Sequence, residues 1–174
     1  MKTIVITGPE STGKTLLSEY LARELHCPWI PEYAREYVGT LERPYSYKDL
    51  EHIFEMQVSL RLEMEKSNVE FLILDTWLII TKIWFLEVFK KYPLLMDREI
   101  EKHRVDLYLV CKPDIPWLPD PLRENGGEKR DYLLIKYMEE IKKTKSNFVL
   151  IGGVGEERLR IALLAVKKQF NLPL

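Results

Sequence analysis

The chain has 174 residues, 46% of them apolar, and its 26 basic residues nearly balance its 27 acidic ones. This length and apolar content suit one domain with a sizeable core, so we expect a single domain over residues 1–174. Because the charges are mixed along the chain and the formal net charge is −1, the composition argues against a nucleic-acid or membrane-surface partner and favours a small molecule.

Two further observations bear on the compartment. The cysteines, Cys27 and Cys111, are far apart and show no C-x-x-C spacing, so we expect two buried thiols in a reducing compartment. The apolar residues at the N-terminus are too few for a signal-peptide core, and the apolar stretch 71–89 is interrupted by Asp75, Lys82 and Glu87, which disfavours a membrane span. Together these features predict a cytoplasmic protein.

A phosphate-binding pattern lies near the N-terminus. Residues 8–15 match G-x-x-x-x-G-K-[ST], the β-branched run 4–6 before them predicts a strand, and leucines at helical spacing behind them predict a helix. This P-loop is expected to bind ATP, with Lys14 neutralising the β- and γ-phosphates and the Thr15 hydroxyl holding Mg²⁺. The predicted nucleotide-binding residues are Gly8, Pro9, Glu10, Ser11, Thr12, Gly13, Lys14 and Thr15.

The next segment predicts a site for the second substrate. Residues 28–31 read as a short strand, and Glu32 and Arg35 follow it. Ligands of open parallel sheets bind beyond the carboxyl ends of the strands, so both side chains are candidates for substrate contact; the alternative is a solvated helix start in which Arg35 forms an ion pair. Further on, Ser46 and Asp49 form a capping-box pattern that opens a helix to about residue 66, on which His52 is expected to be solvated.

A second metal ligand is predicted after the next strand. The apolar run 71–74 is typical of a central parallel strand, and it ends at Asp75. An acid there in a P-loop chain corresponds to the Walker B position, where Asp75 would hold Mg²⁺ opposite Thr15. The alternative is that Asp75 caps a helix that begins near Trp77.

The C-terminal half predicts two more strands with a lid between them. Strands are expected at 107–110 and 148–151, helices at about 128–145 and after residue 155, and an irregular segment rich in proline and glycine at 115–127. The arginines Arg123 and Arg130 bracket Asn125-Gly126-Gly127, so closure of this lid could bring their guanidinium groups onto the transferring phosphoryl group; the alternative is two surface arginines. Residues 111–114 match the guanine-reading motif [NT]-K-x-D except at its first position, and no D-x-x-G follows Asp75, which disfavours a GTPase. Strands alternating with helices predict a doubly wound parallel sheet.

Taken together, these motifs resemble a known family over about residues 2–170. The P-loop, Glu32-Tyr33-Ala34-Arg35-Glu36, Asp75-Thr76, 81–84 and 116–123 are similar to the ribosylnicotinamide kinase domain of the NadR proteins and to the stand-alone AAA-type P-loop ATPases related to it. The resemblance implies a three-layer P-loop NTPase fold, with a five-stranded parallel sheet in the order 2-3-1-4-5 and a lid at about 113–130. It also implies transfer of the ATP γ-phosphoryl group to the 5′-hydroxyl of nicotinamide riboside.

The chemistry of phosphoryl transfer assigns roles to individual residues. The expected catalytic residues are Lys14, Asp75, Glu32, Arg123 and Arg130, with either Glu32 or Asp75 accepting the proton of the attacking hydroxyl. The expected substrate-binding residues are Tyr33, Arg35, Trp77, Trp117 and Asp120, the aromatic ones because a pyridinium ring favours an aromatic face.

The chain also departs from the family pattern. Trp77 stands where relatives often carry an acid, Pro121-Leu122 interrupts the lid motif, and the H-x-G-H motif of the NadR adenylyltransferase domain is absent. A second class of function stays open. The protein could be an ATP-binding switch or interaction protein that hydrolyses ATP slowly and signals through its lid or a partner.

Overall fold

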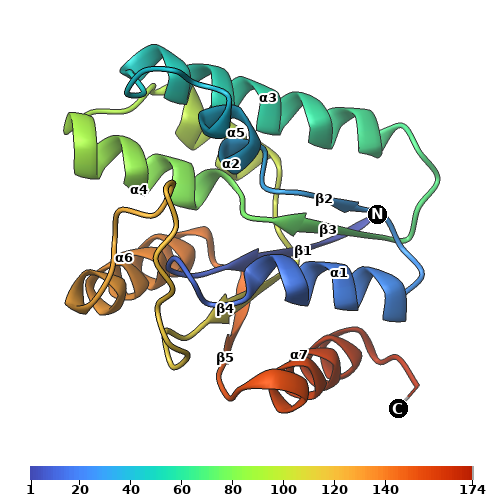
Figure 1. The fold of residues 1–174 in the computed structure, drawn as a ribbon. Coiled ribbons are helices and arrows are strands. Elements are labelled where there is room, and N and C mark those ends of the chain that lie inside the picture. The colour runs from blue at the N-terminus through green and yellow to red at the C-terminus, as the bar shows by residue number, and fades with distance from the viewer. Residues whose placement is uncertain (174) are drawn as a thin grey trace.

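The computed structural model describes residues 1–173, which fold around a five-stranded parallel sheet (Figure 1). Its strands are β1 (Lys2–Thr7), β2 (Trp29–Ile30), β3 (Phe71–Asp75), β4 (Leu107–Cys111) and β5 (Asn147–Ile151). They lie in the order β2-β3-β1-β4-β5, and each adjacent pair is parallel. The predicted fold class and strand order are confirmed.

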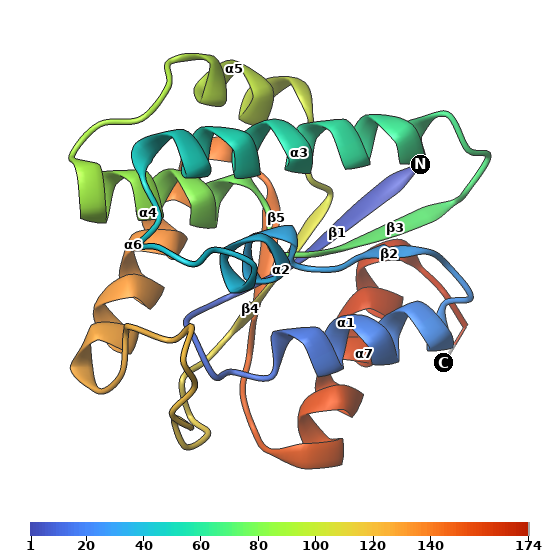
Figure 2. The same ribbon diagram turned by 45° about the horizontal axis from the view of Figure 1, so that its top comes forward.

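Helices cover both faces of the sheet, which gives three layers (Figures 1 and 2). Alternate strand residues supply the two cores, so that Ile4 and Ile6 pack on one face of the sheet and Val5 on the other. The helices on the Ile4 face are α1 (Lys14–Glu24) and α7 (Gly155–Phe170). Those that pack on the Val5 face are α3 (Tyr47–Glu65), α4 (Leu78–Phe89), α5 (Leu95–Lys102) and α6 (Glu128–Thr144).

The register of the strands determines which residues meet at one edge of the sheet. Ile6 pairs with Asp75 across β1 and β3, and Thr7 pairs with Val110 across β1 and β4. The segment that follows β1 therefore lies between the carboxyl ends of β3 and β4, which is where ligands bind in open parallel sheets. The short helix α2 (Tyr33–Gly39) begins at the corresponding end of β2.

Some local predictions hold and others are wrong. At Ser46, the backbone N–H and the hydroxyl both donate to the Asp49 carboxylate, at 2.7 and 2.6 Å, which confirms the capping box. His52 is half-buried rather than solvated, because its Nε2 lies 2.8 Å from the Tyr33 hydroxyl. Cys27 is likewise only half-buried, whereas Cys111 is buried as expected. No helix in the described part of the chain is both long and apolar enough to span a membrane.

Candidate active site

The P-loop has the geometry that phosphate binding requires. Gly13 has a left-handed backbone with φ of 76°, and α1 begins directly after it, so the free N–H groups of the first helical turn face the loop. The Thr12 hydroxyl and the Lys14 ammonium both donate to the carbonyl oxygen of Pro9, at 2.8 and 3.0 Å. These contacts hold the lysine over the loop, where phosphate oxygens would replace the carbonyl as its partner.

Gly8 shows why the first glycine of the pattern is needed. Its φ is 137°, and a Cβ added there would lie 2.5 Å from the carbonyl oxygen of Cys111 on the neighbouring strand β4. A side chain at this position would therefore push β4 away from the turn of the loop.

Asp75 and Thr15 lie together, as predicted. The Thr15 hydroxyl donates to Asp75 Oδ2 at 2.5 Å, whereas Asp75 Oδ1 is buried and has no hydrogen-bond partner among residues 1–173. Burial raises the pKa of Asp75, while the hydrogen bond from Thr15 and the charge of Lys14 oppose that shift. An unpaired carboxylate oxygen beside a threonine hydroxyl fits the oxygen ligands that Mg²⁺ prefers.

The helix-capping alternative for Asp75 is wrong. Helix α4 begins at Leu78 with Trp77 at its N-cap position, and no side chain caps it. Asp75 is the last residue of β3, and its side chain bonds to the P-loop helix instead.

A cavity of about 770 Å³ extends from the P-loop toward α2 and α4. Glu32 lines it, at the N-cap position of α2. The pKa of Glu32 is raised chiefly by burial; the charge of Lys14 opposes the shift, and that of Asp75 adds to it. Glu32 therefore takes up a proton more readily than an exposed glutamate, as a proton acceptor in catalysis requires.

The aromatic side chains of the cavity differ from those that the sequence suggested. Tyr33 bonds to His52, and Trp77 is buried with the Arg61 guanidinium 5.4 Å from its ring centroid. Trp117 packs beside Gly126 and has a buried Nε1. Within the described chain, none of these three aromatic residues lines the cavity. The aromatic wall instead includes Tyr45 and Trp84, whose ring centroids are 4.9 Å apart in an edge-to-face arrangement.

Several cations that line the cavity are already paired with carboxylates. Arg35 bonds to Asp120, Arg43 bonds to Asp49 through both terminal nitrogens at 2.7 and 2.9 Å, and Lys129 bonds to Glu87. The alternative that Arg35 forms an ion pair is thus correct, although its side chain also faces the cavity.

Arg123 differs from these paired cations. It donates to the carbonyl oxygen of Leu118 at 2.6 Å, lines the cavity, and forms no ion pair within residues 1–173. Its charge is therefore available to a phosphate group.

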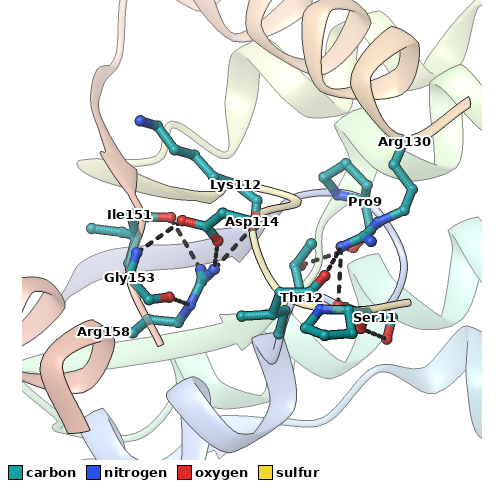
Figure 3. Close-up of polar contacts among 11 residues, drawn as sticks. Pro9, Ser11, Thr12, Lys112, Asp114, Arg130, Ile151, Gly153 and Arg158 are labelled. Atoms are coloured by element: carbon teal, nitrogen blue, oxygen red, sulfur yellow. Dashed lines mark hydrogen bonds and ion pairs between the residues drawn. The ribbon is translucent and has the colours of Figure 1, made fainter. Parts of the chain in front are cut away.

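Arg130 lies behind the P-loop rather than in the cavity (Figure 3). Its side chain comes from the first turn of α6 and is buried, with 6% of the residue exposed. Its Nη2 donates to the carbonyl oxygens of Ile115 and Ser11, at 2.9 and 3.3 Å. In this arrangement Arg130 holds the backbone of the P-loop, and its guanidinium bonds to carbonyl oxygens rather than facing the cavity.

Asp114, the last residue of the partial guanine motif, is also occupied (Figure 3). Arg158 pairs with one of its carboxylate oxygens, and the N–H of Gly153 donates to the other at 2.8 Å. The same arginine donates to the carbonyl oxygens of Lys112 and Ile151, so it joins the loops that follow β4 and β5. A carboxylate held in this way does not offer its oxygens to a guanine base.

The fold and this site define the class as a P-loop, kinase-like α/β protein. The chain belongs to the AAA domain family AAA_28, whose model matches residues 3–158.

Two comparisons with curated proteins and two with solved structures are informative. The chain is 26% identical over 148 residues to the trifunctional NAD biosynthesis/regulator protein NadR of Escherichia coli K12, covering 80% of this chain and 36% of that protein. It is 25% identical over 154 residues to the protein of the same name from Salmonella typhimurium LT2, covering 86% of this chain and 38% of that one. It therefore spans little more than a third of these relatives.

Among solved structures, NadR protein in complex with NR superposes with a TM-score of 0.84 at 25% identity, covering 99% of this chain and 52% of that one. Deoxyadenosine kinase from M. mycoides shares the fold, with a TM-score of 0.64 at 16% identity over 95% of this chain and 99% of that one. The two comparisons agree on the kinase-like fold.

Proposed function

We propose that this protein is an ATP- and Mg²⁺-dependent kinase that phosphorylates nicotinamide riboside to nicotinamide mononucleotide. The observation that carries the proposal is the single cavity that contains the P-loop, the carboxylate of Glu32 and the aromatic wall. A phosphoryl donor on the P-loop and an acceptor against that wall would lie in the same cavity, and proximity of this kind supplies much of the catalysis of phosphoryl transfer.

Each polar group of the site has a role in this reaction. Gly8 to Thr15 would bind the triphosphate through backbone N–H groups, and Lys14 would neutralise its charge. Thr15 and Asp75 would hold Mg²⁺, which when bound offsets charge on the phosphate oxygens. Glu32 would accept the proton of the acceptor hydroxyl, the role for which Asp75 stays the alternative. Arg123, which no carboxylate neutralises, would stabilise charge on the transferring group.

The acceptor half of the cavity suits an uncharged or cationic ring. Tyr45 and Trp84 offer aromatic surfaces, and the carboxylate of Glu124, which forms no ion pair within residues 1–173, lies among the same lining residues. A planar cation such as a pyridinium ring gains from both, because an aromatic face attracts cations by roughly 0.5 to 2 kcal/mol. An acceptor that already carries a phosphate would find the nearby cations Arg35, Arg43 and Lys129 paired. These features favour a nucleoside over a nucleotide as the acceptor.

The relatives support the same substrate. NadR is described as an NAD biosynthesis protein, its structure has been solved with NR bound, and a further NadR structure contains AMP-PNP. Because this chain covers only part of those proteins, we carry over the kinase step alone.

The test is ADP formation from ATP and Mg²⁺ with a panel of nucleosides. We expect nicotinamide riboside to stimulate ADP release strongly, and Lys14→Ala to abolish the stimulation without lowering the thermal melt. Nucleotide hydrolysis that no small acceptor stimulates would favour the switch function instead. Stimulation only by an alcohol without a pyridine ring would keep the kinase and refute its substrate.

A further inference from the structure

Glu10 occupies a P-loop position that the phosphate-binding pattern leaves unspecified, yet its carboxylate has specific partners. Oε2 accepts the backbone N–H of Asn125 at 3.0 Å, and Oε1 accepts the Asn125 side-chain amide at 2.8 Å and the backbone N–H of Glu124 at 3.3 Å. These partners belong to the lid segment, defined here as residues 113–127, between β4 and α6. One glutamate of the nucleotide-binding loop thus holds two consecutive residues of the lid segment.

The next P-loop residue holds the other arm of the lid segment. The Ser11 hydroxyl donates to the carbonyl oxygen of Pro116 at 3.3 Å and accepts the N–H of Leu118 at 3.1 Å. The backbone of Ser11 has a left-handed φ of 55°, and its carbonyl oxygen accepts the bond from Arg130 (Figure 3). Adjacent residues, Glu10 and Ser11, therefore anchor both arms of the lid segment to the P-loop.

The far end of the lid segment contacts the acceptor side of the cavity. Asp120 pairs with Arg35 of α2, and Glu124 accepts the Tyr45 hydroxyl at 3.0 Å. Arg123, a cation without a carboxylate partner, lies between these two acidic residues in the sequence and lines the cavity. The lid segment thus contacts both the P-loop and the acceptor side of the cavity. Glu10 holds it at Glu124 and Asn125, immediately after Arg123.

We propose that Glu10 is a positioning residue that holds the lid segment closed over the cavity, so that Arg123 faces the phosphates and water is excluded. The proposal rests on the kinase function proposed above. With the lid segment closed, the bond between the γ-phosphorus and its bridging oxygen breaks as a bond forms to the acceptor hydroxyl, whose proton passes to the base. With it loosened, water attacks the same phosphorus, and the products are ADP, inorganic phosphate and a proton. Closure of this kind protects a phosphoryl donor from water.

The first test measures the lid directly by amide hydrogen exchange. In Glu10→Ala we expect the amides of Glu124 and Asn125 to exchange about tenfold faster than in the wild type, because their acceptor is lost. Asn125→Ala removes one of the three hydrogen bonds to Glu10 and should give a smaller effect. Glu63→Ala, at an exposed position of α3, is the matched control and should leave these amides unchanged. Unchanged exchange in Glu10→Ala would overturn the proposal.

The second test measures where the phosphoryl group goes. The ratio of inorganic phosphate to phosphorylated nucleoside should rise about tenfold or more in Glu10→Ala, with kcat for transfer lowered more than the ATP KM is raised. Glu10→Gln keeps one acceptor oxygen of similar shape and should recover part of the transfer, which also serves if the alanine variant folds poorly. Faster exchange with an unchanged ratio would reduce Glu10 to a structural contact and refute the positioning role.

The two proposals fail in different ways. If the wild type phosphorylates no nucleoside, the proposed substrate is wrong, and the lid role is then decided by exchange and by hydrolysis of ATP alone. In that case Glu10→Ala should still hydrolyse ATP faster than the wild type, because the loosened lid segment admits water. An equal rate would overturn the role of Glu10.

Discussion

The aromatic residues of the cavity give the sharpest prediction, because the sequence and the structure suggest different aromatic residues for the acceptor site. Trp84 lines the cavity beside Tyr45, whereas Trp117, one of the aromatic residues that the sequence suggested, packs beside Gly126 outside it. We predict that Trp84→Ala lowers kcat/KM for nicotinamide riboside and leaves the ATP KM unchanged. Trp117→Ala should lower kcat/KM less.

The magnitude follows from the contact that is lost. A cation over an aromatic ring gains roughly 0.5 to 2 kcal/mol. Since about 1.36 kcal/mol corresponds to a tenfold change, kcat/KM should fall by about 2- to 30-fold. A neutral nucleoside loses only the packing part, so its decrease should be smaller. Trp84→Phe keeps an aromatic face and should recover most of the activity.

The assay is steady-state ADP formation at saturating ATP, with the acceptor varied, for the cationic and the neutral nucleoside. Thermal melts must accompany it, because removing the edge-to-face pair of Trp84 and Tyr45 costs about 0.5 to 1.5 kcal/mol of folding stability. An equal decrease for both nucleosides would refute the cation argument. A larger decrease in Trp117→Ala than in Trp84→Ala would refute the structural placement.

Three further predictions test the catalytic groups. Asp75→Asn should raise the Mg²⁺ concentration needed for half-maximal activity at least about tenfold, since it keeps the shape but removes the charge that faces the metal, and an unchanged Mg²⁺ titration would contradict the metal role. Because burial raises the pKa of Glu32 above its ordinary value of 4.5, kcat/KM should fall as the pH drops through that raised value, and Glu32→Gln should abolish this acid limb. A limb that persists in Glu32→Gln would identify Asp75 as the base. Arg123→Ala should lower kcat with little change in the ATP KM, whereas Arg130→Ala, which loses two hydrogen bonds from a buried cation, should lower the melting temperature by several degrees. The opposite pattern in the two arginine variants would refute their structural assignment.

Most of the fold could be predicted from the sequence because its signals are local. The runs 4–6, 71–74 and 107–110 are continuously apolar, as strands buried on both faces must be, and the P-loop pattern specifies a turn of backbone that needs glycine at particular positions. The pairing of Thr15 with Asp75 also followed, since parallel strands bring their carboxyl ends to one edge. Helix α5 was missed, because Leu95–Lys102 spans only 8 residues, about two turns.

Which side chains line the cavity depends on tertiary packing. Tyr45 precedes α3 and Trp84 lies within α4, and nothing in the local sequence around either residue indicates that their rings meet. Arg130 shows the same limit, because an arginine beside a glycine-rich lid has the same sequence pattern whether it faces a phosphate or, as here, the carbonyl oxygens behind the P-loop.

The sequence by itself determined the sheet, the phosphate loop and the meeting of Thr15 with Asp75, because each depends on residues close together in the chain or on strand order. Only the tertiary structure decided which side chains line the acceptor cavity and which P-loop residue holds the lid segment. The bond between Glu10 and Asn125 joins residues separated by 115 positions, and such contacts are fixed by the packing of whole helices and loops rather than by any local pattern.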